Sequence, residues 1–144
     1  MRGRVRKAFT LVEILIVVVI LGILAAIVVP QFTNATQDAQ AGNLQSQLDT
    51  LNNQIELFRA RTNAYPTIAE FNAATVTSPI AYTNWGPFID GGYLKAPPVN
   101  PVNNASDVVA AAAVGSGWVW DAASGTLTAC EYDESTKRPT PGVP

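Results

Sequence analysis

The fold of this 144-residue chain is decided by the stretch KAFTLVEILIVVVILGILAAIVV, residues 7–29. Residues 14–29 carry no charge, and only Thr10 and Glu13 interrupt the apolar run of residues 9–29. An α-helix rises about 1.5 Å per residue, so about 20 residues cross a hydrocarbon layer of ~30 Å. We therefore expect residues 9–29 to form a helix that spans a membrane.

The flanks of the apolar run indicate its orientation in the membrane and whether it is cleaved as a signal peptide. The preceding residues, MRGRVRK, are basic and include no acid, so the positive-inside rule places residue 1 in the cytoplasm and the rest of the chain outside. A cleaved secretory signal peptide would need a shorter apolar core and a cleavage site of small residues, which VVPQFTN at residues 28–34 does not offer. An uncleaved anchor fits the length but leaves the acid within the run unexplained.

Glu13 is the unusual residue of this segment. A charged side chain costs ~2.5–3.5 kcal/mol at the centre of a membrane helix and less near its end, so an acid in such a run suggests a function. The alternative is that Glu13 lies at the level of the lipid headgroups and stays hydrated.

The motif KAFTLVE at residues 7–13, after a basic leader and before an apolar helix, resembles the processing segment of type IV pilins and type II secretion pseudopilins. The resemblance implies that residues 1–8 are a prepilin leader peptide ending at Ala8. It also implies that Phe9 becomes the N-methylated terminus and that Glu13 is needed for processing and assembly. The family usually has Gly before the cut, and this chain has Ala8.

Beyond the spanning segment, residues 30–62 are predicted to continue the helix as an amphipathic half. The apolar residues recur in steps of four and three, at Leu44, Leu48, Leu51, Ile55 and Phe58. This spacing lasts about two heptads, short of the three or four that indicate a coiled coil, so we expect the stripe to pack on the chain's own head.

Two residues weaken the predicted helix near the end of the spanning segment. Pro30 removes a backbone donor, and Gly22 has a low helix propensity. We expect a kink or local loosening at these positions. Pro30 also stands where the helix of the resembled family has a proline.

Residues 63–130 are predicted to form a small globular head. Five prolines exclude a long helix or a central strand from residues 67–116. In residues 117–128, the alternating Trp118 and Trp120 and a turn-forming segment predict a β-hairpin. The order of short motifs resembles the heads of major pseudopilins, which implies an α+β fold with a small antiparallel sheet packed on the long helix.

Charge and composition exclude several functions. Four of the nine basic residues lie in the first seven positions, so the chain without its first eight residues has five bases, eleven acids and a net charge of −6 instead of −2. A nucleic-acid partner is not expected, because such a binder needs Lys and Arg on its folded part. The chain has no His and one Cys, which excludes Ser-His-Asp and Cys-His catalysis, His-ligated metals, Cys₄ zinc and an intrachain disulfide.

The C-terminal part offers one thiol and four acids as candidate site residues. Many type IV pilins close a C-terminal loop with two cysteines, so the single Cys130 favours a pseudopilin; a buried free thiol is favoured over a reactive or intersubunit one. Major pseudopilins carry calcium in a C-terminal loop, and calcium needs about six to eight oxygens. Residues 131–144 hold three prolines and mixed charge, so a mobile, solvated tail is favoured over a calcium site, and no cofactor is expected. The weak calcium candidates are Asp121, Glu131, Asp133 and Glu134.

No pattern in the sequence supports an enzyme, and the leading expectation is a structural subunit of a helical, homo-oligomeric filament. The subunit would cross the bacterial inner membrane once, with its head in the periplasm. It would meet lipid, a prepilin peptidase/methyltransferase and an inner-membrane secretion or pilus assembly platform. A type II secretion pseudopilus that drives protein export is favoured. The alternatives are a type IV pilus pilin for adhesion, motility or DNA uptake and, less favoured, an uncleaved, membrane-anchored periplasmic binding module.

Overall fold

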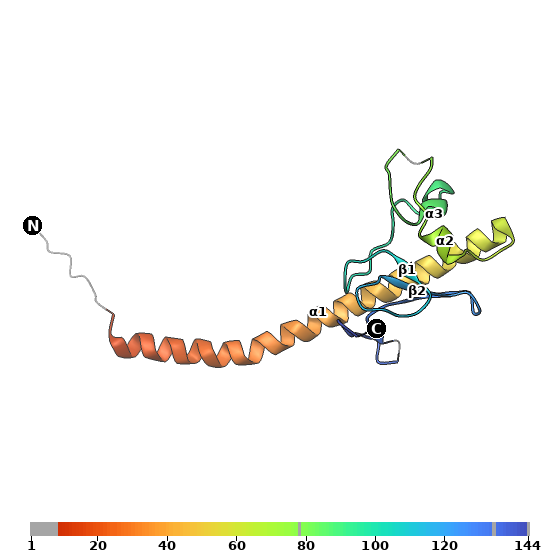
Figure 1. Cartoon of the computed structure of the whole chain (residues 1–144). Coiled ribbons are helices and arrows are strands. Elements are labelled where there is room, and N and C mark those ends of the chain that lie inside the picture. The colour runs from red at the N-terminus through yellow and green to blue at the C-terminus, as the bar shows by residue number, and fades with distance from the viewer. Residues whose placement is uncertain (1–8, 78, 134, 144) are drawn as a thin grey trace, which may run out of the picture. The chain divides into compact units, whose positions relative to one another are not determined.

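The computed structural model describes residues 9–77, 79–133 and 135–143, and it describes no side chains for residues 30–34. The chain divides into two compact units, Met1–Thr36 and Gln37–Pro144. Figure 1 labels most of the elements. In chain order they are α1 (Leu11–Thr62), α2 (Ile68–Phe71), α3 (Gly86–Asp90), β1 (Val108–Val109), β2 (Trp118–Asp121), β3 (Thr126–Ala129), β4 (Tyr132–Asp133) and β5 (Arg138–Pro139).

The first unit holds the N-terminal part of α1, whose apolar side chains have no protein cover. Every side chain from Phe9 to Val29 is exposed. A large aliphatic side chain contributes about 1.5–3 kcal/mol when it is fully buried, so this run leaves roughly tens of kcal/mol of apolar burial unused. Such a helix requires lipid or other helices around it.

Helix α1 is one uninterrupted helix of 52 residues. It continues through Gly22 and Pro30, so neither residue ends the helix. Because Pro30 has no backbone N–H, the carbonyl of Ala26 lacks its usual helical donor. The kink or loosening expected at these positions stays a prediction.

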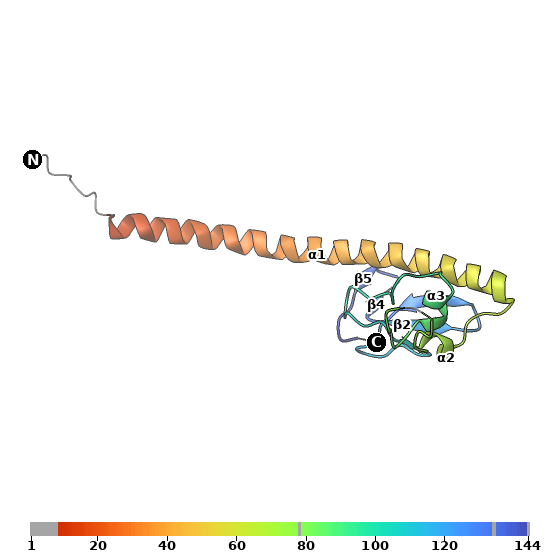
Figure 2. The same cartoon turned by 90° about the horizontal axis from the view of Figure 1, so that it is seen from above.

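In the second unit, the C-terminal part of α1 forms one side of the core, and the other elements lie along one side of it (Figure 2). The predicted stripe is confirmed, because its five residues are at most 7% exposed and belong to one core cluster with the strands and short helices. The stripe therefore serves the chain's own head.

Helices α2 and α3 bring aromatic rings onto the end of this stripe. The ring of Phe71 stacks on that of Phe88 with 5.1 Å between centroids, and Phe88 stacks on Phe58 of α1 at 4.8 Å. Trp85, before α3, is fully buried with a left-handed backbone (φ 58°), and its indole N–H donates to the Ser106 carbonyl at 2.7 Å. As the prolines predict, both helices are short, with four and five residues.

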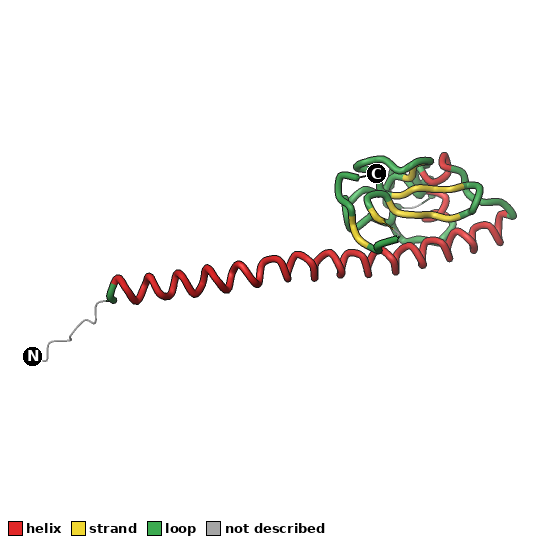
Figure 3. Tube along the Cα trace, turned by 90° about the horizontal axis from the view of Figure 1, so that it is seen from below, coloured by secondary structure: helices red, strands yellow, loops and turns green. Residues whose placement is uncertain are grey.

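The hairpin predicted for residues 117–128 is confirmed. Strands β2 and β3 pair antiparallel, with Trp118 opposite Ala129, and Trp118 and Trp120 are both buried. Strand β1 pairs with the other edge of β2 in parallel, so the sheet has the order β1-β2-β3 and is mixed rather than purely antiparallel. The irregular connection through residues 110–117 allows this parallel pairing. The strands and the long helix together confirm the α+β class (Figure 3).

The segment 131–144, which we expected to be a mobile tail, is in part folded. Strands β4 and β5 pair antiparallel, the N–H of Thr140 donates to the carbonyl of Glu131 at 2.8 Å, and Glu131 is only 4% exposed. Proline content suggested otherwise, but Pro139 lies in a two-stranded pair, where an edge position needs no donor. The described part of this segment therefore extends the head, and the expected mobility stays a prediction.

Candidate functional site

Two residues build the polar start of α1. Thr10 directly precedes the helix, and Glu13 is its third residue. The Glu13 carboxylate accepts hydrogen bonds from the backbone N–H and from the hydroxyl of Thr10, both at 3.1 Å. In return, the N–H of Glu13 donates to Thr10 Oγ1 at 3.2 Å. This reciprocal arrangement is a capping box, which satisfies donors that the start of a helix leaves free.

The capping box gives the Glu13 carboxylate hydrogen-bond donors but no positive charge. It receives two neutral donors from its own chain and lies at the positive end of the helix macrodipole. Within the described ranges it has no ion-pair partner, so its negative charge is not neutralised there. Sequence reasoning missed Thr10 as a site residue, although a Thr-x-x-Glu spacing before an apolar run is the signal of a capping box.

The predicted cut lies between Ala8 and Phe9. Ala8 lies outside the described residues. Phe9 is 81% exposed and lines an open apolar groove along the first turns of α1, together with side chains such as Leu11 and Ile14. The predicted new terminus is therefore adjacent to the capping box and to an apolar surface.

The helix that follows contains one candidate membrane span in the part of the chain that is described. The span is Leu11–Val29, with 19 residues and a mean hydropathy of 3.3. By length and composition it can cross a membrane, as the sequence predicts.

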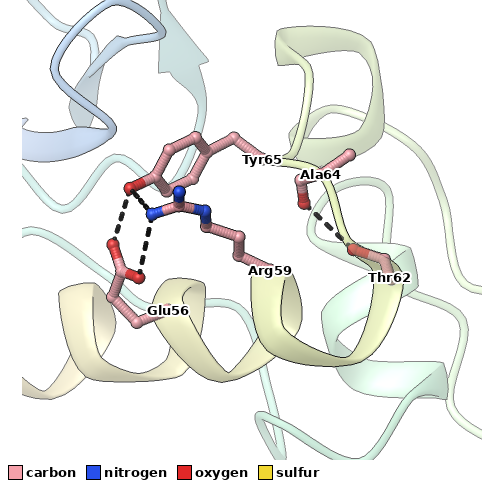
Figure 4. A network of polar contacts seen from close by, with 5 residues as sticks. All are labelled: Glu56, Arg59, Thr62, Ala64 and Tyr65. Atoms are coloured by element: carbon pink, nitrogen blue, oxygen red, sulfur yellow. Dashed lines mark hydrogen bonds and ion pairs between the residues drawn. The ribbon is translucent and has the colours of Figure 1, made fainter.

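At its other end, α1 is tied to the head by a polar network around Tyr65 (Figure 4). The Tyr65 hydroxyl donates to the Glu56 carboxylate at 2.9 Å and accepts from the Arg59 guanidinium at 2.6 Å, while Glu56 and Arg59 form an ion pair at 3.6 Å. The hydrogen bond to Glu56 raises the pKa of Tyr65, because the carboxylate stabilises the protonated phenol. The Tyr65 ring also meets Trp120 edge-on at 5.9 Å between centroids. The network therefore connects α1 to β2.

Two of the four calcium candidates, the exposed Asp121 and the half-buried Asp133, are the last residues of β2 and β4 and already bind the turns that follow. Asp121 accepts hydrogen bonds from the Ser124 hydroxyl and a backbone N–H, which lower the pKa of its carboxyl group. Oδ1 of Asp133 accepts hydrogen bonds from the hydroxyl and the N–H of Ser135, and these bonds hold the pKa of Asp133 at about 2. Both carboxylates act as caps of local turns.

The other two calcium candidates do not complete a site. Glu131 is buried and accepts a hydrogen bond from the N–H of Gly115 at 3.1 Å, and Glu134 lies outside the described residues. Across residues 9–77, 79–133 and 135–143, no group of three His, Cys, Asp or Glu residues could hold a metal ion. Among the described candidates, the carboxylates therefore do not gather into one cluster of ligands.

Cys130 is a fully buried free thiol, which is the state that the sequence favours. Burial raises the pKa of Cys130 and makes its thiolate scarce, so the group is unreactive. The fully buried Asn100 organises its surroundings by donating to the carbonyls of Gly117 at 2.9 Å and Cys130 at 3.0 Å. Sequence reasoning missed Asn100, because Asn before Pro signals only a turn.

The fold and the N-terminal site define a class of protein: a membrane-anchored subunit whose capped apolar helix continues into a small α+β head. Residues 3–29 match the family model of the prokaryotic N-terminal methylation motif, and residues 31–118 match that of type II secretion system protein G. The chain therefore belongs to the type II secretion system protein G family.

Curated relatives agree with this assignment. The chain is 36% identical to the type II secretion system core protein G of Aeromonas hydrophila over 104 residues, which cover 72% of this chain and 73% of the relative. It is also 36% identical to the core protein G of Pseudomonas aeruginosa over 107 residues, 72% of this chain and 73% of that protein. No solved structure matches the chain. The expected pseudopilin identity, with a motif for prepilin peptidase processing, is confirmed.

Proposed function

We propose that this chain is cleaved between Ala8 and Phe9, N-methylated at Phe9 and assembled into the helical pseudopilus that drives protein export. The match of residues 3–29 to the methylation motif supports processing in this region. The observation that carries the proposal is the capped start of α1, whose first helical hydrogen bond joins Ile14 N–H to the Thr10 carbonyl. A cut before Phe9 removes the leader and keeps the hydrogen bonds that join the described residues at the helix start.

In this proposal, the precursor crosses the inner membrane once. Its basic N-terminus lies in the cytoplasm, the span Leu11–Val29 lies in lipid, and the head lies in the periplasm. This topology brings the leader to a prepilin peptidase/methyltransferase and the anchor to the inner-membrane assembly platform. The subunit acts as a structural component rather than as an enzyme.

Cleavage creates a cation that Glu13 can pair with. A carboxylate in the filament core costs several kcal/mol unless it is paired, and its two neutral donors from Thr10 leave its charge in place. The α-amine of Phe9 exists only after cleavage and keeps its positive charge when it is methylated. Maturation therefore supplies the partner that makes the burial of Glu13 tolerable.

Two geometries allow this pairing. Within one helix, Phe9 and Glu13 are four residues apart and lie about one turn from each other. Between subunits, Glu13 of an incoming subunit meets the Phe9 amine of a neighbour and sets the axial register. We favour the second geometry, because a filament needs one shared register and because Thr10 already binds one oxygen, Oε2, of Glu13 from within the chain.

Mass spectrometry of the mature protein from its native envelope tests the processing step. The proposal predicts an N-terminus at methylated Phe9. An intact leader would contradict it and would favour the uncleaved, anchored binding module.

Deletion of the gene tests the secretion role. We expect the loss of secreted enzymes from the medium, with twitching and adhesion unchanged, and recovery when the chain is supplied from a plasmid. Loss of twitching with normal secretion would instead support the type IV pilus alternative.

A further inference from the structure

The two outer edges of the three-stranded sheet are closed by the same chemical group. On β3, the side-chain amide of Asn52 from α1 donates to the Leu127 carbonyl at 3.0 Å and accepts from the Leu127 N–H at 2.8 Å. On β1, the amide of Asn72, after α2, donates to the Val108 carbonyl at 2.7 Å and accepts from the Val108 N–H at 3.2 Å. Each asparagine thus binds one edge residue as a neighbouring strand would.

The hydrogen bonds inside the sheet show that the backbone N–H and carbonyl groups of Leu127 and Val108 point away from β2. In the β2–β3 pair, the N–H of Gly125 donates to the Asp121 carbonyl and the N–H of Cys130 donates to the Gly117 carbonyl. Antiparallel pairing alternates, so the outward backbone groups of β3 belong to Leu127 and to Ala129. Asn52 occupies the groups of Leu127, and Ala129 is buried at 7% exposure.

The short strand β1 has one outward residue. The N–H of Trp118 donates to the carbonyl of Asp107, the residue before β1, so Asp107 faces β2 and the groups of Val108 face away from it. Asn72 occupies both groups of Val108. Neither edge of the sheet therefore offers a free pair of groups to an added strand.

We infer that Asn52 and Asn72 specify how this subunit makes contacts. They exclude strand addition to the three-stranded sheet when two heads meet and when a head meets an exported protein. An open sheet edge is a template for any extended chain, and proteins close such edges to avoid unwanted pairing. A pseudopilin head works at high local concentration beside other copies. With the edges of this sheet closed, assembly is left to the exposed apolar side chains from Phe9 to Val29.

The experiment uses the full chain in detergent micelles, because the anchor belongs to the protein. The test variants are Asn52→Ala, Asn72→Ala and the double variant. Asn53→Ala and Asn43→Ala are the matched controls, since both residues are exposed asparagines of the same helix α1. Near-ultraviolet circular dichroism of the buried tryptophans reports whether each variant keeps its packed head.

Two measurements follow on these proteins. Hydrogen exchange of the wild-type chain should show Leu127 and Val108 amides protected at least ~10-fold beyond an exposed amide, as expected for amides held by a hydrogen bond. Sedimentation with infrared spectroscopy should show association of the double variant at least ~10-fold stronger than that of wild type, with new intermolecular β-sheet. The two controls should match wild type.

Fast exchange of both amides in the wild-type chain would overturn the inference without any variant. A double variant that keeps its tryptophan spectrum, exposes both amides and still associates no more than wild type would also overturn it. If the double variant does not fold, the single variants decide, because each opens one edge and leaves the other closed. Unchanged association in both folded single variants would then contradict the inference.

Discussion

Thr10 and Glu13 close a reciprocal pair of hydrogen bonds across the first turn of α1. Thr67 and Glu70 close the same pair across the first turn of α2, with the Glu70 carboxylate 2.7 Å from the Thr67 N–H. One sequence pattern, Thr-x-x-Glu, thus starts both helices. In the head it is a structural cap, whereas at the N-terminus it holds the charged group on which the proposed assembly depends.

Thr10→Ala tests the N-terminal box. The substitution removes a cap worth ~1 kcal/mol, which corresponds to roughly a fivefold change in an equilibrium. We expect normal cleavage and a several-fold lower filament yield, measured by immunoblotting of the sheared fraction. Thr10→Ser keeps the hydroxyl and should assemble normally, and Thr67→Ala should lower only the stability of the head. Equal defects in Thr10→Ala and Thr10→Ser would contradict a capping role.

Pro30→Ala tests the proposed weak point of α1. Alanine restores the missing donor to the Ala26 carbonyl and favours an interior helical position by about 3 kcal/mol relative to proline. We expect slower hydrogen exchange around this position and a stiffer filament with altered helical parameters, measured by electron microscopy. If filament yield, stiffness and helical parameters all stay unchanged, the proline has no role in packing.

Gly125→Ala tests the contact between the hairpin turn and Tyr65. Gly125 has a left-handed backbone (φ 71°), and a Cβ at this position would overlap the Tyr65 ring. Gly142 is the matched control, because its φ is 79° and the space around it is open. Gly142→Ala should cost about 1–2 kcal/mol from backbone strain alone, and Gly125→Ala should cost more in denaturant unfolding of the full chain in micelles. Equal losses of stability in the two variants would show that the Tyr65 ring moves aside without an energetic cost.

Asp133→Asn tests the acid response of the folded C-terminal segment. Hydrogen bonds from Ser135 depress the pKa of Asp133 to about 2, below an unfolded value of about 3.9. The carboxylate therefore stabilises the folded state above about pH 4, and this contribution is lost as the pH falls toward 2. Asp133→Asn should flatten the dependence of the thermal midpoint on pH in that window. An identical slope in Asp133→Asn would contradict the role of the turn.

The periodic parts of the chain could be predicted from the sequence. The stripe from Leu44 to Phe58 repeats at helical spacing, and Trp118 and Trp120 alternate at strand spacing, so each pattern reports which side chains are buried. The order of residues around Glu13 likewise identified the N-terminal segment. In all three cases, the information is local.

The remaining features depend on partners that are distant in the sequence. Asn52 is not part of the apolar stripe, and its partner Leu127 lies 75 residues away. The parallel pairing of β1 and the buried side chain of Asn100 also rest on tertiary contacts that carry no local period. In residues 131–144, by contrast, the pairing of β4 with β5 is local, but strands of two residues are too short to show a period in the sequence.

The central claim is that filament assembly needs the charge of Glu13, because this charge pairs with the α-amine of Phe9 that cleavage creates. Glu13→Gln isolates this charge, because glutamine can also occupy the third position of a capping box and preserve the helix start. The measurement is the filament yield of cells that make only Glu13→Gln, compared with the wild type at equal amounts of processed subunit. We predict normal cleavage and at least a ~10-fold loss of filaments. When wild-type subunits are also present, the variant should enter mixed fibres, since its free α-amine can pair with the Glu13 carboxylate of a wild-type neighbour. Normal filaments built from Glu13→Gln subunits alone would contradict the account.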